Sequence, residues 1–131
     1  MMPVTVLIVD DAESCAETLE IALLALPNVE ILQARNGNQA WQMLQSKRVS
    51  AIITDLHMAG MDGFELIERL RADSNNAGMP LIAVSGDTDP ETPSRVRQLG
   101  ADAYFPKPYS PGAVRATLER LLHAYSSHTS T

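Results

Sequence analysis

The stretch VTVLIVDD, residues 4–11, decides the fold. An apolar, β-branched strand, Val4–Asp10, closes directly on an acidic pair, Asp10 and Asp11. A strand that is apolar on both sides is typical of a parallel sheet that helices cover on both faces. The acidic pair then lies at the carboxyl end of the strand, which is where open α/β sheets bind their ligands.

Three later predicted strands also end on residues that can carry chemistry. They are Ala51–Asp55, which ends on a third carboxylate, Leu81–Ser85, which is followed by Gly86, and Ala103–Phe105, which leads into Lys107-Pro108. Parallel strands point the same way, so their ends meet at one edge of the sheet. Three carboxylates, one hydroxyl and one ammonium at this edge predict a divalent-cation site with a phosphoryl acceptor in it.

Strand-like and helix-like segments alternate five times along the chain. The remaining strand is Val29–Ala34, and the predicted helices are Ala12–Leu26, Asn38–Lys47, a helix from Asp62-Gly63 to Arg71, one from Asp89-Pro90 or Thr92-Pro93 to Leu99, and one from Ser110-Pro111 to about Ala124. Five β-then-α units predict an α/β fold: a doubly wound, five-stranded parallel sheet with five helices. A single reversal of winding gives the strand order 2-1-3-4-5, and Asp10, Asp11 and Asp55 fall at the switch point between strands one and three.

Bulk properties limit the possible classes of protein. A chain of 131 residues suits one domain, which we place at residues 3–124, followed by a short polar tail at 125–131. The net charge of −6 argues against direct binding to a nucleic-acid backbone. Cys15 is the only cysteine, so no internal disulfide forms. The start of the chain has no basic signal region, and no apolar run approaches the ~20 residues of a membrane helix. These features predict a cytoplasmic protein.

The three carboxylates repel one another unless a cation joins them. Two unit charges about 4 Å apart cost about 1 kcal/mol in water and about 4 kcal/mol at an effective dielectric constant of 20. Mg²⁺, with Mn²⁺ as a substitute, is the hard cation that such oxygen ligands prefer. Asp55 can then attack a phosphoryl group, with Lys107 balancing the developing charge and Ser85 donating a hydrogen bond. Gly86 leaves room for a phosphoryl oxygen.

The chain resembles the receiver domain of two-component response regulators from about Pro3 to Leu122. The matching residues are Asp10-Asp11, Asp55, Met58, Met61-Asp62-Gly63, Ser85-Gly86, Gly100-Ala101-Asp102-Ala103-Tyr104 and Lys107-Pro108. The resemblance implies the flavodoxin-like receiver fold, with Asp55 as the acceptor of a phosphoryl group from a partner histidine. It also implies that Ser85 and Tyr104 form a switch pair, that Lys107 pairs with the phosphoryl group, and that the bond before Pro108 is cis.

The same resemblance implies a particular set of metal ligands. Asp11 and Asp55 would bind Mg²⁺ directly, together with the backbone carbonyl of His57, and Asp10 would act through water. We expect the side chains of His57 and Asp87 at the rim to modulate the lifetime of the phosphoryl group; metal binding by the His57 ring is the alternative. Asp62 is interpreted as a helix cap.

The predicted function is that of a phosphorylation-operated switch, and not that of a metabolic enzyme. Its partners would be a histidine kinase or histidine phosphotransfer protein, and a downstream protein or output domain on the face of the fourth helix, fifth strand and fifth helix. Ile21 and Leu24, an apolar pair on one face of the first helix, would meet the donor, or would simply form a half-covered flank.

Three alternatives remain open. An FMN carrier of the flavodoxin type has this topology, but Asp10-Asp11 would repel its phosphate. A phosphatase that forms an aspartyl phosphate would need an acid two residues after the nucleophile, where His57 stands. A receiver fold can also serve as a phosphorylation-independent interaction module, although the complete set of five site residues argues against that use.

Overall fold

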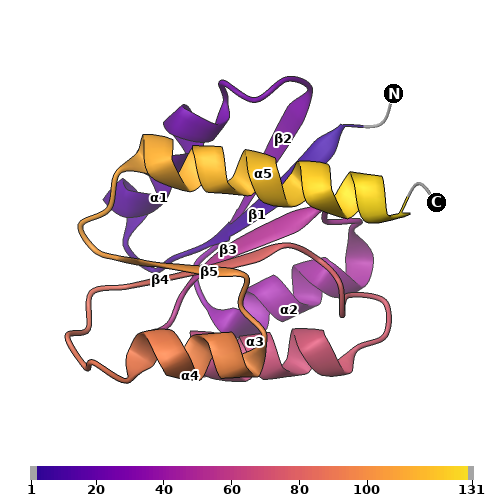
Figure 1. Ribbon diagram of the computed structural model, residues 1–131. Coiled ribbons are helices and arrows are strands. Elements are labelled where there is room, and N and C mark those ends of the chain that lie inside the picture. Colours follow the sequence, from indigo (N-terminus) through magenta and orange to yellow (C-terminus); the bar gives the residue numbers. More distant parts are fainter. Residues whose placement is uncertain (1–2, 130–131) are drawn as a thin grey trace.

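The computed structural model describes residues 3–129, and these form one five-stranded parallel sheet covered by helices (Figure 1). The strands lie in the order β2-β1-β3-β4-β5, as predicted. Their bounds are β1 Val4–Val9, β2 Val29–Ala34, β3 Ala51–Asp55, β4 Leu81–Ser85 and β5 Ala103–Pro106. The helices are α1 Glu13–Leu23, α2 Gly37–Ser46, α3 Gly63–Ala72, α4 Thr92–Leu99 and α5 Pro111–Thr129.

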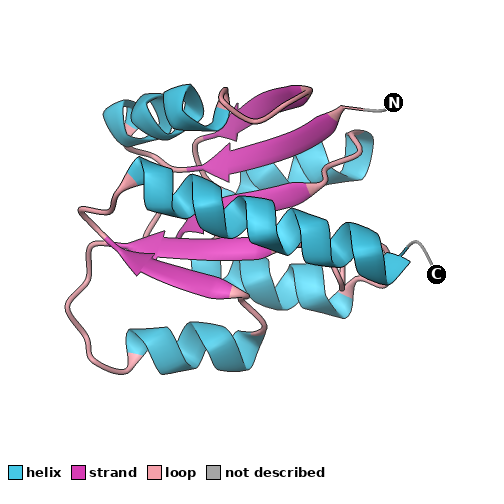
Figure 2. Ribbon diagram, turned by 45° about the horizontal axis from the view of Figure 1, so that its top comes forward, coloured by secondary structure: helices cyan, strands magenta, loops and turns pink. Residues whose placement is uncertain are grey.

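The helices divide between the two faces of the sheet, α1 and α5 on one and α2, α3 and α4 on the other (Figures 1 and 2). Successive side chains of a strand point to opposite faces, so each central strand supplies both layers. Val6 and Ile8 of β1 pack under α1 and α5, whereas Leu7 and Val9 pack under the other three helices. Two separate cores result, which explains why the central strands are apolar throughout.

Three helix ends differ from the sequence prediction. Helix α1 ends at Leu23 instead of Leu26, because the amides of Ala25 and Leu26 bond three residues back and tighten the last turn. Helix α4 uses the later of its two predicted starts, at Thr92. Helix α5 continues to Thr129, past the predicted end near Ala124, and so includes most of the predicted tail; residues 130 and 131 lie outside the described residues.

Local signals fix the other boundaries that bear on the site. Asn36 caps α2 and Asp62 caps α3, each accepting a hydrogen bond from the amide three residues later. The predicted role of Asp62 as a cap is thus confirmed. Gly100 ends α4 in the left-handed region, at a φ of 115°.

One arginine ties the far ends of α3 and α4 together. The guanidinium of Arg71 donates to the carbonyl of Gly100 at 2.9 Å and to the carboxylate of Asp102 at 3.2 Å. It also donates to the carbonyls of Ala77 and Met79 in the loop before β4. The carboxyl end of α4 is therefore held firmly to the body of the protein.

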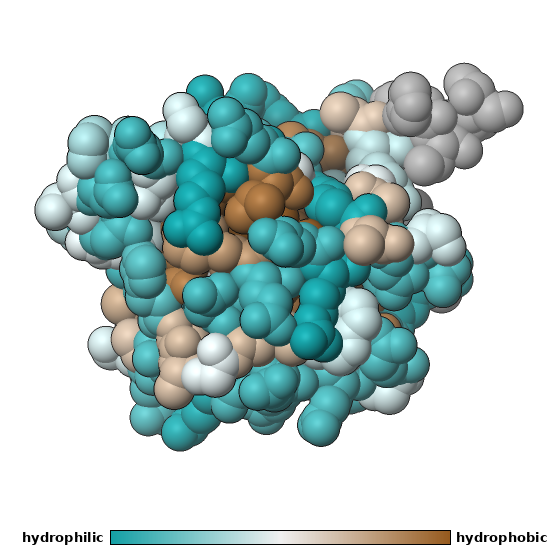
Figure 3. All heavy atoms as spheres, turned by 90° about the horizontal axis from the view of Figure 1, so that it is seen from below, coloured by the Kyte–Doolittle hydropathy of each residue, from teal (hydrophilic) through white to brown (hydrophobic). Residues whose placement is uncertain are grey.

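The helical surface is mainly polar. Viewed from below Figure 1, hydrophilic residues dominate, and hydrophobic side chains show in a hollow near the centre (Figure 3). The large hydrophobic residues that are exposed within the described part of the chain are Ile21 of α1, Leu24, which directly follows that helix, and Tyr125 of α5. No helix in that part is both long enough and apolar enough to span a membrane.

Candidate functional site

The acidic residues at the ends of β1 and β3 meet as the sequence predicts. One carboxylate oxygen from each of Asp10, Asp11 and Asp55 lies within 4.8 Å of the other two. Asp10 and Asp55 are 4% and 6% exposed, while Asp11 faces solvent. Three clustered carboxylates with one open side are a donor set that suits a hard divalent cation. These residues could therefore hold such an ion.

Lys107 brings a positive charge to the same place from the end of β5. Its Nζ donates to Asp10 Oδ2 at 2.9 Å and to Asp55 Oδ2 at 3.1 Å. Its backbone amide donates to the carbonyl of Ser85 at 2.7 Å, which fixes the loop that carries it, and its bond to Pro108 is cis as predicted. Burial alone would lower the pKa of Lys107, but its hydrogen bonds with Asp10 and Asp55 outweigh burial and raise that pKa.

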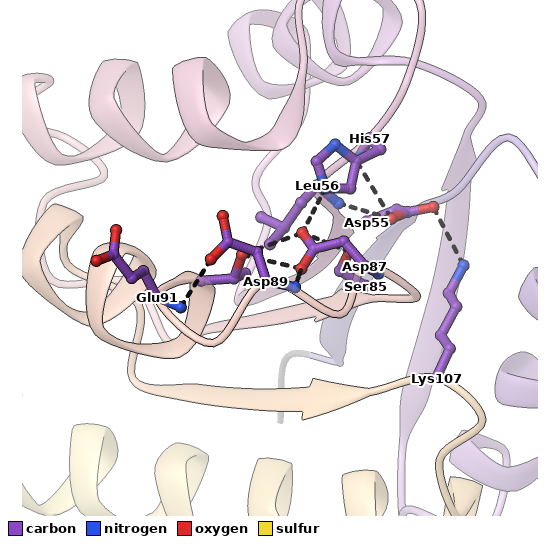
Figure 4. Close-up of polar contacts among 9 residues, drawn as sticks. Asp55, Leu56, His57, Ser85, Asp87, Asp89, Glu91 and Lys107 are labelled. Carbon is purple, nitrogen blue, oxygen red and sulfur yellow. Dashed lines mark hydrogen bonds and ion pairs between the residues drawn. The ribbon is translucent and has the colours of Figure 1, made fainter.

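Asp55 has its two carboxylate oxygens in different settings (Figure 4). The Oδ1 atom accepts hydrogen bonds from the backbone amides of Leu56, at 2.7 Å, and His57, at 3.3 Å, whereas Oδ2 faces Lys107. Burial raises the pKa of Asp55, and the ammonium of Lys107 offsets only part of that effect. The two oxygens of this carboxylate therefore differ: backbone amides hold one, and the other faces an ammonium.

Ser85, Gly86 and Tyr104 surround the next part of the site. Ser85 is fully buried at the end of β4, and its Oγ accepts a hydrogen bond from the amide of Asp87 at 3.1 Å. The pKa of Tyr104 is raised, first by burial and then by the charge of Asp87. A hydrogen bond with Ser85 offsets part of this rise. A side-chain carbon at Gly86 would meet nothing closer than Lys107 Cβ at 3.9 Å, so the space beside it is open.

The rim residues His57 and Asp87 are brought into direct contact. His57 Nε2 lies 2.5 Å from Asp87 Oδ2 (Figure 4). The pKa of Asp87 is lowered, first of all by this hydrogen bond. An ionised carboxylate only accepts, so Nε2 carries the shared proton. The sequence placed both residues at the rim, but it did not predict that they pair.

Thr92 is a further participant that the sequence reasoning missed. Its Oγ1 lies 2.9 Å from Asp87 Oδ1 and 3.1 Å from Asp87 Oδ2, and the residue is buried. In the sequence, Thr92 was predicted only as one of two possible starts of the fourth helix. No local sequence pattern marks this contact, because it depends on how the loop between Asp87 and Thr92 folds.

An apolar groove borders the site on the α1 side. It has a volume of about 410 Å³ and is lined by Ser14, Cys15, Thr18, Lys107, Pro108, Tyr109 and Pro111. Ile21, 72% exposed, lies one turn beyond Thr18 on α1, and Leu24 is 57% exposed. A larger hollow, about 1170 Å³, lies by the amino ends of the strands near Thr5 and Ser50, and none of the predicted site residues lines it.

Comparisons with known proteins agree with this geometry. The model of the response regulator receiver domain family matches residues 6–119. A chemotaxis protein CheY homolog of Campylobacter jejuni is 30% identical over 117 residues, covering 88% of this chain and 90% of the relative. The phosphate regulon transcriptional regulatory protein PhoB of Pseudomonas aeruginosa is 31% identical over 93% of this chain, which corresponds to 53% of PhoB. The structure of the chemotaxis response regulator CheY4 of Vibrio cholerae superposes with a TM-score of 0.82, at 29% identity, over 92% of this chain and 99% of CheY4.

Proposed function

The chain belongs to the response regulator receiver domain family, and on that premise we propose that Asp55 accepts a phosphoryl group from a phosphohistidine or a small phosphodonor in a Mg²⁺-dependent reaction. The observation that carries the proposal is the position of the Lys107 ammonium, which lies within 3.1 Å of a carboxylate oxygen on both Asp10 and Asp55. Asp11 completes the acidic cluster on the open side. Acceptor, cation ligands and counter-charge thus share one edge of the sheet.

In the proposed reaction, an oxygen of Asp55 forms a bond to phosphorus as the bond from phosphorus to the donor's imidazole nitrogen breaks. The imidazole leaves with that bond's electron pair and takes up a proton. Mg²⁺, held by Asp11, Asp55 and the backbone carbonyl of His57, with Asp10 acting through water, would neutralise charge on the phosphoryl oxygens. Lys107 leaves its contact with Asp55 to pair with the phosphoryl group, and the Leu56 amide keeps the carboxylate in place.

Ser85 and Tyr104 are the proposed switch residues. Ser85 is buried at the end of β4 and follows Val84, the register partner of Asp55, which supports a hydrogen bond from its hydroxyl to a phosphoryl oxygen on Asp55. Moving a two-state equilibrium from 1:99 to 99:1 needs about 5.5 kcal/mol of differential stabilisation. Contacts of the phosphoryl group with Ser85 and Lys107 are the proposed source, with Tyr104 following Ser85 and passing the change to α4, β5 and α5.

The proposed donor is a helix that bears the phosphohistidine and docks on α1. Thr18 of α1 lines the groove beside Lys107, and the exposed side chain of Ile21 lies one turn further along the same helix. An exposed apolar residue beside a groove at the reactive edge supports docking there. A downstream protein or output domain would bind the face formed by α4, β5 and α5. The cytoplasmic location inferred from composition stays a prediction.

The test is intact mass spectrometry after incubation with acetyl phosphate and Mg²⁺. We expect the added mass of one phosphoryl group in the wild type, and none in Asp55→Asn or after chelation of the metal. Asp62→Asn is the matched control, since it removes a carboxylate that only caps α3 and asparagine caps equally well. It should be phosphorylated like the wild type.

Absence of added mass in the wild type, with no measurable Mg²⁺ affinity, would overturn the proposal and favour the phosphorylation-independent interaction module. Steady turnover of a generic phosphoester that Asp55→Asn abolishes would point to a phosphatase instead. A yellow protein that releases flavin would point to an FMN carrier.

A further inference from the structure

The side chain of His57 contacts two different elements next to the site. Its Nε2 bonds to Asp87 in the loop between β4 and α4, at 2.5 Å. Its ring also packs edge-on against Phe64 of α3, with centroids 5.8 Å apart and an interplanar angle of 68°. His57 follows the acceptor Asp55 by two residues, so these contacts begin at the acceptor loop itself.

Both contacts lead on to α4. Through Asp87, the first path reaches Thr92, the first residue of α4. Through Phe64, the second reaches Arg95, whose guanidinium carbon lies 3.9 Å from the centre of the Phe64 ring, a cation–π contact. Thr92 and Arg95 are three residues apart and therefore lie on one face of the helix. His57 is thus linked to one face of the amino-terminal turn of α4 by two routes, through Asp87 and through Phe64.

The two ends of α4 are held in different ways. At the carboxyl end, the largely buried guanidinium of Arg71 bonds to the carbonyl of Gly100 and to Asp102. At the amino end, the contact between His57 and Asp87 is more exposed, since the His57 side chain is 56% exposed. Exposed pairs of this kind contribute little stability each, so the amino end is the one that can be released.

Asp87 also touches the proposed switch residue. Its amide donates to Ser85 Oγ, and its Oδ2 lies 3.4 Å from the same hydroxyl. A serine hydroxyl has a single proton to donate. If Ser85 gives that proton to a phosphoryl group on Asp55, it loses its donor contact with Asp87. A new negative charge at Asp55 also repels the Asp87 carboxylate.

We propose that Asp87, clamped between His57 and Thr92, is a latch that holds the amino-terminal end of α4 in the unphosphorylated protein, and that phosphorylation opens it through Ser85. The opening step rests on the proposed function, but the latch itself does not. In this arrangement His57 is a positioning residue for the output helix: its backbone serves the site, and its ring restrains α4. Opening turns α4 about its anchored end at Gly100.

The latch is tested first without phosphorylation, by amide hydrogen exchange. Because a half-exposed pair contributes up to about 1 kcal/mol, His57→Ala and Asp87→Ala should each speed exchange of the amides of residues 95–99 roughly two- to fivefold. Exchange in α5 should not change. The acceleration in the double variant should be smaller than the product of the two single effects, because the contact between His57 and Asp87 is lost only once.

Asp89→Ala is the matched control for charge removal in the same loop. Among the described residues, the Asp89 carboxylate bonds to the amide of Glu91 alone, while its own amide, which bonds to Asp87, is retained in the variant. Exchange in α4 should then stay within twofold of the wild type. Equal acceleration in Asp89→Ala, additive effects in the double variant, or unchanged exchange in both single variants would each overturn the latch.

The opening step is tested on the wild type after treatment with acetyl phosphate and Mg²⁺. We expect exchange at residues 95–99 to rise to the level of Asp87→Ala, and Asp87→Ala itself to show little further change. Added mass with unchanged exchange in α4 would overturn the opening step and leave the proposed function standing. No added mass would overturn both the proposed function and the opening step, while the latch would still be judged by the first experiment.

Discussion

At the scale of single residues, the shared ammonium of Lys107 governs the site. Two buried carboxylates, Asp10 and Asp55, divide one positive charge between them. One negative charge is thus left over before Asp11 is counted, which is why the site favours either a proton on Asp55 or a bound cation. The same imbalance that costs stability in the absence of a cation provides its affinity for one.

Asp55→Asn should therefore stabilise the metal-free protein at neutral pH, by about 1 kcal/mol or roughly 4 °C in melting temperature. Burial raises the pKa of Asp55 above its unfolded value of 3.8, so the folded state binds the proton more tightly and the ionised carboxylate costs stability above that folded pKa. The advantage of the variant should shrink as the pH falls through the raised pKa toward 3.8. Thermal melts of both proteins across this range, with chelator present, measure it.

Magnesium should reverse that order. A ligand that binds only the folded state stabilises it by about 2.7 kcal/mol at a concentration 100 times its dissociation constant. The wild type should gain this stabilisation, and Asp55→Asn, which lacks one carboxylate ligand, should gain less. Equal gains in melting temperature for the two proteins on a Mg²⁺ titration would contradict the assignment of Asp55 as a metal ligand.

Sequence alone located most of the residues that now meet at the site. Asp10, Asp55 and Ser85 could be placed because each stands where an apolar run stops, and in a parallel sheet such ends are neighbours. The bond from His57 to Asp87 and on to Thr92 could not be predicted. It depends on how two loops fold toward each other, which strand pattern does not specify.

At the scale of elements, the packing of α3 against the end of β3 depends on glycine at position 63, which has no side chain. The amide of Gly63 donates to the carbonyl of Leu56 at 2.9 Å, which brings the first turn of α3 onto the end of β3. An added Cβ at Gly63 would overlap the backbone of Asp55 and Leu56. Backbone atoms cannot turn aside as a flexible side chain can, so the close approach requires glycine.

Gly63→Ala should therefore destabilise the protein by about 1–3 kcal/mol, the usual cost of overpacking, and weaken Mg²⁺ binding because the Asp55 backbone is displaced. Gly112→Ala is the control, since the nearest atom to an added Cβ there is Ser110 Oγ at 3.7 Å, and alanine favours a helix. Urea unfolding and Mg²⁺ titration measure both effects. Equal stability of the two variants would contradict the packing argument.

The boundaries of elements were predicted less well than their order. The alternation of strand and helix followed from apolar periodicity, and the strand order followed from handed crossovers. The end of α1 at Leu23 could not be predicted in this way. Leu26 lies outside the helix but is buried in the core, so its apolar side chain extended the helical pattern of the sequence by three residues. A small, polar sequence likewise gave no sign that α5 continues to Thr129.

At the scale of the whole molecule, the proposed donor surface and the latch use different elements. The donor would approach over α1 and the groove beside Pro108, whereas the latch acts on α4 across the sheet. Both meet only at the carboxyl edge of the strands. This arrangement predicts that a substitution on the proposed donor surface of α1 leaves phosphorylation of Asp55 by a small phosphodonor unchanged.

Ile21→Glu should slow phosphotransfer from a phosphohistidine partner at least tenfold, since it buries a charge in an apolar contact. Phosphorylation by acetyl phosphate and the melting temperature should stay at wild-type values, because Ile21 is exposed in the free protein. Gln42→Glu, which adds the same charge at an exposed position on α2, is the control. If the partner transfers its phosphoryl group to Ile21→Glu at the wild-type rate, the proposed docking surface is wrong.

The two cores on either side of the sheet share no side chain. Repacking beneath α1 and α5 can proceed without disturbing the layer beneath α2, α3 and α4, since only strand backbone lies between them. After gene duplication, the layer that carries the proposed donor surface of α1 can therefore change while the layer that carries α4 is kept. Related proteins with this fold can therefore come to differ in their partners and still keep the same reactive centre.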